Sequence, residues 1–493
     1  MISNLKEKYE MMPLPLKASL WFVFCSVMQR GISVIATPIF TRIMSTTDYG
    51  QYGVFNSWLD IISIFVTLRL YYGVFVQGLV KYEEDQKQFA SSMQGLGFTL
   101  CLSWTIIYAV SHDFWNHLFK LTTVQMLAMM VMIWSAGAFR FWAAEQRNQY
   151  KYRLLVAITL IVSVMKVVFG VTFVVLAEDK VTARILALAL VELIGYSGAF
   201  FIQMIRGKKF FSAKYWKIAL LFNLPLIPHY LSQTVLNSAD RIMIRSMIGA
   251  SEAGIYTLAY SISRIMSIFN TALHQTISPW TYQKIKANSI QDIKYVTYPA
   301  LIGIAAINLM LIAFAPEIVY IFAPKSYHNA IWVIPPVAMS VFFTFSYNMF
   351  ATFEFYFERT KFIMTASIIG AVLNIVLNYI FLRLFGYYAA GYTTLVCYMV
   401  YAIGHYIFMG RVCQQCLDGI RPYETSRLLI ITGLFLGIGF ILMLSYLNTV
   451  VRYCLIIFFC MVCLYKRNVV KAYINQFFEI RKEKRSKGAS KQS

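Results

Sequence analysis

The sequence predicts an all-α polytopic membrane protein. Its 493 residues are 59% hydrophobic and 13% charged, whereas soluble domains are about 45–50% apolar and about 25% charged. Apolar stretches of about 20 residues, the length that crosses a bilayer core, recur along the chain. They are continuous and not alternating, which argues against a transmembrane barrel. This composition excludes a soluble enzyme, a disordered protein and a fibrous protein.

Fourteen apolar segments are predicted to cross the membrane, in two pseudo-symmetric six-helix lobes followed by a C-terminal helix pair. The last segment is short and carries Arg452 at its edge, so a count of twelve is the alternative. The expected spans are 18–40, 52–72, 89–110, 122–139, 154–177, 183–205, 218–239, 254–276, 296–316, 330–352, 361–384, 388–409, 428–447 and 450–465.

These spans divide the chain into an N-lobe, a C-lobe and connecting segments. Most of the net charge of +22 falls on the cytosolic side when both termini are placed there, as the positive-inside rule requires. The charge therefore sets orientation and does not indicate nucleic-acid binding. The predicted parts are a cytosolic lead-in 1–17, the N-lobe 18–205, a basic linker 206–217, the C-lobe 218–410, a cytosolic linker 411–427, the pair 428–465 and a basic cytosolic tail 466–493.

A short motif occurs twice, after the first span of each six-span block. Asp48-x-Gly50-x-Tyr52 is matched by Glu252-x-Gly254-x-Tyr256. The glycine suits a tight turn, and the acid and tyrosine suit a helix start at the membrane interface. This pattern favours a parallel repeat about an axis along the membrane normal. The alternative is a common turn that occurs twice by chance.

Two prolines lie inside the span expected at 218–239. Pro225 and Pro228 each remove a backbone hydrogen bond and clash with the preceding turn, so this helix should be kinked. A kink is a candidate hinge for alternating access, and a static kink without a gating role is the alternative.

Five ionisable residues lie deep within the predicted spans, where a charge costs roughly 2.5–3.5 kcal/mol and usually faces a cavity or a partner. Three interpretations remain open. The cations line a cavity that binds an anion such as a diphosphate, or Asp60 and Glu192 neutralise Arg30 and Lys166 as internal ion pairs, or an acid carries a coupling proton or sodium ion. The five residues are Arg30, Asp60, Lys166, Glu192 and Arg264.

Uncharged polar residues recur at helical spacing in the same spans. Gln233 and Asn237 are separated by four residues, as are Asn374 and Asn378, and His229 precedes the first pair. Interhelical hydrogen bonding is the usual role of such residues, and polar lining of a cavity is the alternative.

The sequence shows no catalytic or metal-binding motif. Cys413 and Cys416 form a CxxC without a second pair or a nearby histidine, so buried thiols are expected and no metal site or cofactor. There is no P-loop and no GxSxG elbow. We therefore expect a transporter and not an enzyme, with H+ or Na+ as the coupling ion.

Three stretches carry a family resemblance. They are Ala36–Tyr52 (ATPIFTRIMSTTDYGQY), Leu236–Ile244 (LNSADRIMI) with Glu252–Tyr256, and Leu373–Tyr379 (LNIVLNY) with the following segment to Thr393. This pattern resembles the polysaccharide and O-antigen flippases of the multidrug/oligosaccharidyl-lipid/polysaccharide exporter superfamily. Ala389-Ala-Gly departs from the usual Gly-Ala-Ala order of that family, which affects the turn before the twelfth span.

The resemblance implies a protein that flips an undecaprenyl-diphosphate-linked oligosaccharide to the outer leaflet of a bacterial cytoplasmic membrane. Two lobes would alternate access around a cationic cavity. The depth argument then makes Arg30, Lys166 and Arg264 the diphosphate or sugar contacts. The partners would be the lipid-linked oligosaccharide, membrane lipids and other polysaccharide assembly proteins. The last two spans would resemble the pair that forms a lipid-tail groove in lipid II flippases.

Other functional classes are less compatible with the sequence. A cation-coupled multidrug exporter of the same fold would favour acids over cations in its cavity. A glycan polymerase or ligase would need a long outer loop, which the sequence lacks, and a non-transporting scaffold would leave the deep charges unexplained.

Overall fold

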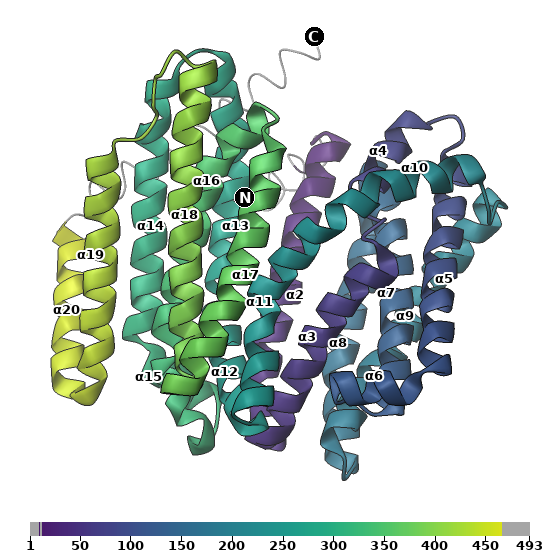
Figure 1. The fold of residues 1–493 in the computed structure, drawn as a ribbon, viewed down its shortest axis with the longest axis horizontal. Coiled ribbons are helices and arrows are strands. Elements are labelled where there is room, and N and C mark those ends of the chain that lie inside the picture. Colours follow the sequence, from purple (N-terminus) through teal and green to yellow (C-terminus); the bar gives the residue numbers. More distant parts are fainter. Residues whose placement is uncertain (1–8, 10–11, 466–493) are drawn as a thin grey trace. The chain divides into compact units, whose positions relative to one another are not determined.

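The computed structural model describes residue 9 and residues 12–465, except for the side chains of residues 360–361 and 462–465. Most of the predicted lead-in and the basic tail lie outside the described residues. Within the described residues every regular element is a helix, which confirms the all-α prediction. The chain divides into two compact units, Met1–Gly254 and Ile255–Ser493, whose helices are labelled in Figure 1. The lobe boundaries expected at 205 and 218 stay a prediction.

Unit 1 is a helical bundle in which α7 packs against α9 and α5, α8 packs against α9 and α2, and α3 packs against α11. Two short helices, α4 and α6, lie at the ends of the long ones (Figure 1). The helices are α2 (Leu14–Ile43), α3 (Thr46–Thr67), α4 (Val74–Lys81), α5 (Gln86–Val110), α6 (His112–Phe119), α7 (Thr123–Asn148), α8 (Tyr152–Leu176), α9 (Lys180–Gly207), α10 (Ala213–Asn223), η1 (Leu224–Leu226) and α11 (Ile227–Met247).

Unit 2 is built around α16 and α18, which pack along each other. Helix α17 covers α18, α13 and α14 flank α16, and α19 packs on α14 (Figure 1). Its helices follow α12 (Ala250–Ser263), which crosses the unit boundary, and are α13 (Met266–Lys286), η2 (Ile290–Asp292), α14 (Ile293–Ala313), α15 (Ala315–Phe322), η3 (Lys325–Trp332), α16 (Ile334–Tyr356), α17 (Thr360–Phe385), α18 (Ala389–Cys416), α19 (Thr425–Leu444), η4 (Ser445–Leu447) and α20 (Thr449–Tyr465).

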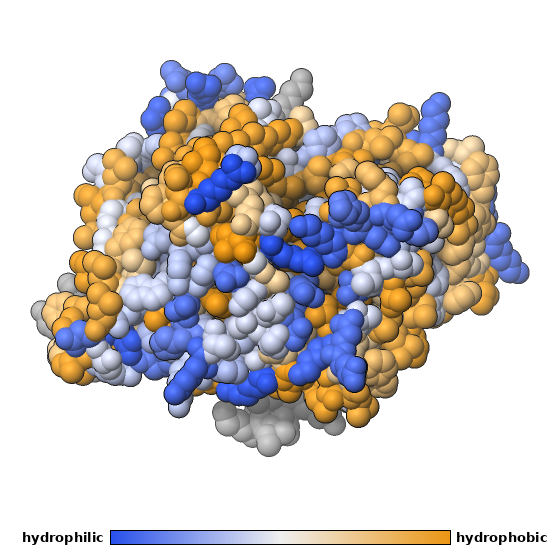
Figure 2. Space-filling view, turned by 60° about the horizontal axis from the view of Figure 1, so that its bottom comes forward, coloured by the Kyte–Doolittle hydropathy of each residue, from blue (hydrophilic) through white to orange (hydrophobic). Residues whose placement is uncertain are grey.

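The described residues include nine helices long and apolar enough to cross a membrane, or ten if the bent pair η3 and α16 is one span. Many large apolar side chains on these helices are exposed, and Figure 2 shows broad hydrophobic areas beside hydrophilic clusters. Such a surface is typical of helices that face lipid. Helices also occupy the other predicted spans, but α3, α11 and α13 fail the same test and α20 is shorter. The multi-pass prediction is confirmed, and the count of fourteen stays a prediction.

The two copies of the repeated motif both lie at helix starts, as predicted. Ser45 caps α3 in a capping box with Asp48, and the second copy lies in the first turns of α12. The glycines, however, are helical and do not form turns. A Cβ on Gly50 would lie 1.9 Å from the Ala250 carbonyl oxygen, and one on Gly254 would lie 2.0 Å from that of Thr46. Glycine is needed here because the two backbones approach closely.

The span predicted at 218–239 is interrupted, as its prolines require. Helix α10 ends at Asn223, the 3-10 turn η1 contains Pro225, and Pro228 lies at the start of α11. Proline is tolerated in the first turn of a helix because no intrahelical partner is lost there. The span predicted at 254–276 is interrupted as well, between α12 and α13 at Arg264.

Candidate functional site

The centre of the candidate site in unit 1 is an ion pair between α8 and α9. Lys166 Nζ lies 2.5 Å from Glu192 Oε1, and the two side chains are 28% and 9% exposed. The ammonium group also lies over the ring of Tyr196, one helical turn further along α9, at 5.5 Å. The predicted pairing of Lys166 with Glu192 is therefore present in the structure.

Tyrosines connect this pair to an arginine that the sequence analysis did not single out. Tyr196 stacks on Phe139 of α7 at 4.2 Å, and both Lys166 and Arg140 act electrostatically on its hydroxyl. The Arg140 guanidinium donates a 2.6 Å hydrogen bond to the Tyr71 hydroxyl and lies over the Tyr71 ring. Arg140 is exposed, and no acid among the described residues forms a salt bridge with it.

A second arginine lies at the end of α3, on a strained turn. Leu68 and Arg69 both have positive φ angles, of 48° and 49°, which is costly for residues with a side chain. The turn is held by buried Asn223 at the end of α10, whose side chain donates to the Leu68 carbonyl at 2.8 Å. The turn that carries Arg69 is therefore hydrogen-bonded to Asn223, the residue immediately before the 3-10 turn η1 that contains Pro225.

The side chain of Arg69 reaches α11. Its guanidinium donates to the Thr234 hydroxyl at 3.1 Å and lies 5.1 Å from the centre of the Tyr230 ring. Its charge also acts on His229, whose Nδ1 is buried and has no hydrogen-bond partner among the described residues. His229 thus lies beside a cation.

Arg30 and Asp60 do not form the ion pair that the sequence analysis considered. Arg30 is half-buried on α2 and Asp60 is exposed on α3, and neither has an ion-pair partner in the described part of the chain. Cys25 packs in a cluster with Val156, and the Phe40 ring lies against Gly170. Along α2, Arg30 lies between Cys25 and Phe40. Along α8, Lys166 lies between Val156 and Gly170.

The third predicted cation, Arg264, belongs to unit 2. It is exposed in the break between α12 and α13, and its guanidinium lies 5.9 Å from the Tyr260 ring centre. No acid among the described residues pairs with it.

The predicted polar residues differ in their surroundings. Gln233 is half-buried on α11, and its backbone carbonyl accepts a 2.7 Å hydrogen bond from the side-chain amide of Asn237. Asn374 and Asn378 are fully buried on α17, and Asn378 accepts from Thr393 of α18. The α17 pair therefore forms the interhelical hydrogen bond that is the usual role of such residues.

Three cations of unit 1 each lie over a tyrosine ring: Lys166 over Tyr196, Arg140 over Tyr71 and Arg69 over Tyr230. Glu192 offsets Lys166, and Arg30, Arg69 and Arg140 have no acidic partner among the described residues. Guanidinium groups bind phosphate oxygens in a bidentate manner, so these cations suit an anionic diphosphate.

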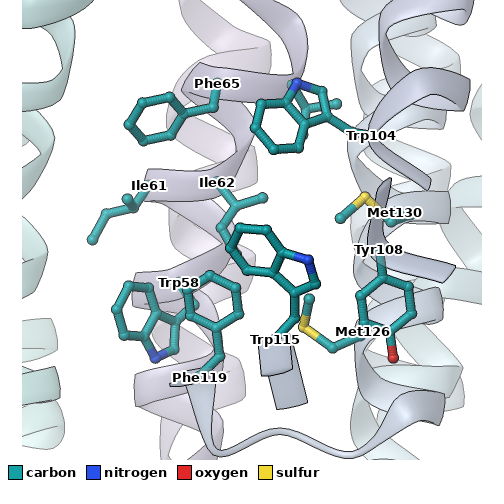
Figure 3. A pocket seen from close by; sticks show the side chains of 11 residues that line it. Trp58, Ile61, Ile62, Phe65, Trp104, Tyr108, Trp115, Phe119, Met126 and Met130 are labelled. Carbon is teal, nitrogen blue, oxygen red and sulfur yellow. The ribbon is translucent and has the colours of Figure 1, made fainter. Parts of the chain in front are cut away.

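Unit 1 also contains an apolar cavity of about 290 Å³ between α3, α5, α6 and α7. Figure 3 shows its aromatic rings and the thioethers of Met126 and Met130 around a common space. The surface of the cavity is apolar, which suits a hydrocarbon chain, and the Tyr108 hydroxyl and the Trp115 indole N–H donate to Asn116 and Ser111. It consists of Trp58, Ile61, Ile62, Phe65, Val66, Trp104, Tyr108, Trp115, Phe119, Met126 and Met130.

The described residues contain no group of three His, Cys, Asp or Glu side chains arranged to hold a metal ion. Cys413 is buried as expected, whereas Cys416 is half-buried and Cys454 and Cys460 are exposed. The expectation of buried thiols is wrong for Cys454 and Cys460, which are exposed on α20.

Two further buried residues were missed by the sequence analysis. Glu354 of α16 and His405 of α18 form a pair inside unit 2. Their signal in the sequence is a charged or titratable residue between aromatic or small neighbours, in Phe353-Glu-Phe355 and Gly404-His-Tyr406.

Comparisons with known proteins agree with this architecture. Residues 16–284 match the family described as "Polysaccharide biosynthesis protein", and residues 225–380 match MatE. A Lsg locus protein 1 of Haemophilus influenzae is 26% identical over 40% of this chain, and the chain spans about half (51%) of that relative's length. An uncharacterized membrane protein of the same organism is 20% identical over 73% of this chain and 88% of its own length.

Solved transporters share the fold. The lipid II flippase MurJ in an inward closed conformation is 12% identical and matches 92% of this chain and 100% of its own, with a TM-score of 0.68. An inward-facing multidrug resistance MATE family transporter of the MOP superfamily is 15% identical and matches 78% of this chain and 95% of its own, with a TM-score of 0.63. The expectation of a transporter agrees with these matches. Because one family description covers more than half of the sequence, the chain belongs to the polysaccharide biosynthesis protein family.

Proposed function

We propose that this protein flips an undecaprenyl-diphosphate-linked oligosaccharide from the cytosolic to the outer leaflet, for surface polysaccharide biosynthesis. The observation that carries the proposal is the group of cations in unit 1 that lie over tyrosine rings, Lys166, Arg69 and Arg140, all within the matched family region. A diphosphate needs several positive groups that no acid neutralises. The lipid portion needs an apolar surface, and the cavity lined by Trp58 and its neighbours offers one in the same unit.

The proposed mechanism is alternating access of two lobes around a cationic cavity. Arg30 and Arg264, which have no acidic partner among the described residues, would contact the diphosphate or an acidic sugar, and Lys166 would contribute while paired with Glu192. Arg69 and Arg140 join them as further contacts. Pro225 and Pro228 would be the hinge, Asp60 a cavity acid, and His229, Gln233, Asn374 and Asn378 polar lining or packing groups.

The proposed setting is the cytoplasmic membrane of a bacterium, with both termini in the cytosol. Membrane lipids and other polysaccharide assembly proteins are the proposed partners, and H+ or Na+ the proposed coupling ion. Helices α19 and α20 correspond to the predicted C-terminal pair, for which a lipid groove is proposed.

Deletion of the gene, followed by extraction of lipid-linked oligosaccharides, tests this function. We expect completed oligosaccharides to accumulate on the cytosolic leaflet and surface polysaccharide to fall at least tenfold. The deletion strain is then complemented with Arg30→Glu, Arg140→Glu or Arg264→Glu, with membrane insertion verified. Each reversal should abolish rescue, whereas Lys217→Glu, at an exposed position of α10, should rescue fully. Rescue by all three reversals would refute the cationic site.

A second candidate is a cation-coupled multidrug exporter of the same fold. The match of residues 225–380 to MatE favours it. An unchanged leaflet distribution of the oligosaccharides, together with lost drug resistance in the deletion strain, would establish this alternative in place of the flippase.

A further inference from the structure

Unit 2 contains a buried acid–base pair that the proposed substrate contacts do not use. Glu354 lies in the last turn of α16 and His405 lies on α18. Glu354 Oε1 is 2.8 Å from His405 Nδ1, and both side chains are 0% exposed. Ionisable groups buried in a membrane bundle are rare and mark functional sites more often than structural ones.

Each partner uses only part of its hydrogen-bonding capacity. Glu354 Oε2 and His405 Nε2 are both buried and have no hydrogen-bond partner in the described part of the structure. A pair kept only for packing normally has its remaining polar atoms satisfied. Each partner therefore keeps one polar atom, Glu354 Oε2 or His405 Nε2, that is available to accept or donate a hydrogen bond.

The surroundings of the pair are aromatic. The His405 ring lies 4.5 Å from the ring of Tyr401 and 5.6 Å from that of Tyr347. Phe362 of α17 approaches it edge-on at 5.5 Å. The Tyr401 hydroxyl is engaged by Ser367 of α17 at 2.9 Å.

Among the described side chains, which do not include that of Lys361, no second charge forms an ion pair with Glu354 or His405. Helices α13, α14, α17, α18 and α19 pack against α16, and His405 is the one group that forms an ion pair with Glu354 among the described residues. The other titratable groups facing the pair are the phenols of Tyr347 and Tyr401, and Glu354 acts on the latter. Both phenols are neutral at ordinary pH.

The isolation of the pair determines how many protons it holds. With one proton shared between them, Glu354 and His405 are net neutral, whether as carboxylate and imidazolium or as carboxylic acid and imidazole. Loss of that proton leaves a net charge of −1 and gain of a second leaves +1. Burying an uncompensated charge is strongly unfavourable, so the closed pair retains one proton. Such a proton belongs to the pair and not to either residue.

We propose that Glu354 and His405 form a proton-binding site that couples transport to proton movement. The coupling part rests on the transport function proposed above, whereas the proton binding does not. While α16 and α18 are closed, the pair holds its proton. When the helices admit water, an O–H or N–H bond breaks, the proton passes to water, and the carboxylate and neutral imidazole that remain are hydrated. Return to the closed state requires a proton to bind again, which links the two movements.

Spectroscopy on the purified full-length protein tests the proton binding without any substrate. At pH 8, ordinary glutamates are ionised carboxylates and ordinary histidines are neutral imidazoles, because their pKa values are about 4.3 and 6.5. We expect either the nitrogen NMR signal of a doubly protonated imidazole or the infrared band of a protonated carboxylic acid. Either signal should disappear in Glu354→Gln, which leaves no carboxyl and no anion to hold an imidazolium, and should persist in Glu358→Gln, a matched control at an exposed position four residues on. Absence of both signals at pH 8 in the wild type would overturn the proposal.

Transport in proteoliposomes tests the coupling. The probe is lipid-linked oligosaccharide extracted from the deletion strain, and a pH-sensitive dye reports proton movement. We expect the wild type to move both, Glu358→Gln to match it, and Glu354→Gln to move oligosaccharide at least tenfold more slowly and independently of pH. Monodisperse elution and unchanged thermal unfolding of Glu354→Gln and of Glu354→Gln/His405→Gln exclude misfolding.

The outcomes separate the two proposals. Oligosaccharide transport with equal proton movement in the wild type and Glu354→Gln refutes the coupling and leaves the flippase intact. The spectroscopic signal without any oligosaccharide transport by the wild type refutes the flippase and leaves the proton site intact.

Discussion

Two ion pairs that join neighbouring helices, one in each unit of the molecule, are built differently. In unit 1 Lys166 and Glu192 lie 2.5 Å apart, with side chains 28% and 9% exposed. In unit 2 His405 and Glu354 lie 2.8 Å apart and neither is exposed. The first joins α8 to α9 and the second joins α16 to α18.

The difference lies in the base. A lysine, with an ordinary pKa of about 10.4, stays protonated at every physiological pH, whereas a histidine, with an ordinary pKa of about 6.5, does not. The Lys166 pair is therefore a fixed pair of opposite charges. The His405 pair can become neutral by moving one proton from imidazolium to carboxylate. This contrast suits a permanent charge beside a series of cations in unit 1 and a proton site in unit 2.

The largest expected effect comes from removing one base or acid. Lys166→Met leaves Glu192 buried without a partner, and protonating an ordinary carboxyl at pH 7 costs up to about 3.7 kcal/mol. We expect the free energy of unfolding, measured by SDS titration in mixed micelles, to fall by about 3 kcal/mol. Glu354→Leu removes the hydrogen bond to His405 and leaves no buried carboxylate behind, so we expect a loss of about 1–2 kcal/mol.

The double variant Lys166→Met/Glu192→Leu is the control for this comparison. It removes both charges and should recover most of the stability that Lys166→Met loses. Equal losses in Lys166→Met and Glu354→Leu would show that the two pairs do not differ in the way described.

A smaller effect is the dependence of stability on pH. Above about pH 6.5 the unfolded chain holds no proton on Glu354 or His405, while the folded pair holds one. Folding then takes up a proton, and stability should fall by up to about 1.4 kcal/mol per pH unit as pH rises. The Lys166 pair has the same charges folded and unfolded between about pH 5 and pH 9, so it contributes no slope.

The measurement is the difference in unfolding free energy between the wild type and each double-neutral variant, from pH 6 to pH 9. Glu354→Gln/His405→Gln should lose the slope, and Lys166→Met/Glu192→Gln should keep it. If stability still falls with pH in Glu354→Gln/His405→Gln, the pH dependence arises from other groups.

The fold was predictable because apolar runs of about 20 residues are a strong and local signal. Lys166 and Glu192 were identified for the same reason, since a charge at the centre of such a run stands out. Arg30 and Asp60, whose pairing was one of three open interpretations, form no ion pair among the described residues, because depth along two helices does not determine which way each side chain faces.

Two of the residues that were missed, Arg140 and Glu354, lie where the predicted span ended too early. Helix α7 continues to Asn148, so Arg140 is helical and reaches Tyr71 instead of lying in a loop. Glu354 lies two residues beyond the span expected to end at 352, inside α16. Hydropathy ends a span at the first charge, whereas the helix continues because a partner on another helix stabilises that charge. Such partners are tertiary contacts that one sequence without an alignment does not reveal.

The smallest expected effects come from the tyrosines beside the two pairs. Tyr196→Phe keeps the ring that Lys166 approaches at 5.5 Å, so the unfolding free energy should change by less than about 0.5 kcal/mol. Tyr401→Phe removes the hydroxyl that bonds Ser367 at 2.9 Å and should cost about 1 kcal/mol, with the pH slope retained because the proton remains on Glu354 and His405. A slope abolished by Tyr401→Phe would extend the proton site to that phenol, and the contrast between the two units would then depend on a network in unit 2 and not on its base alone.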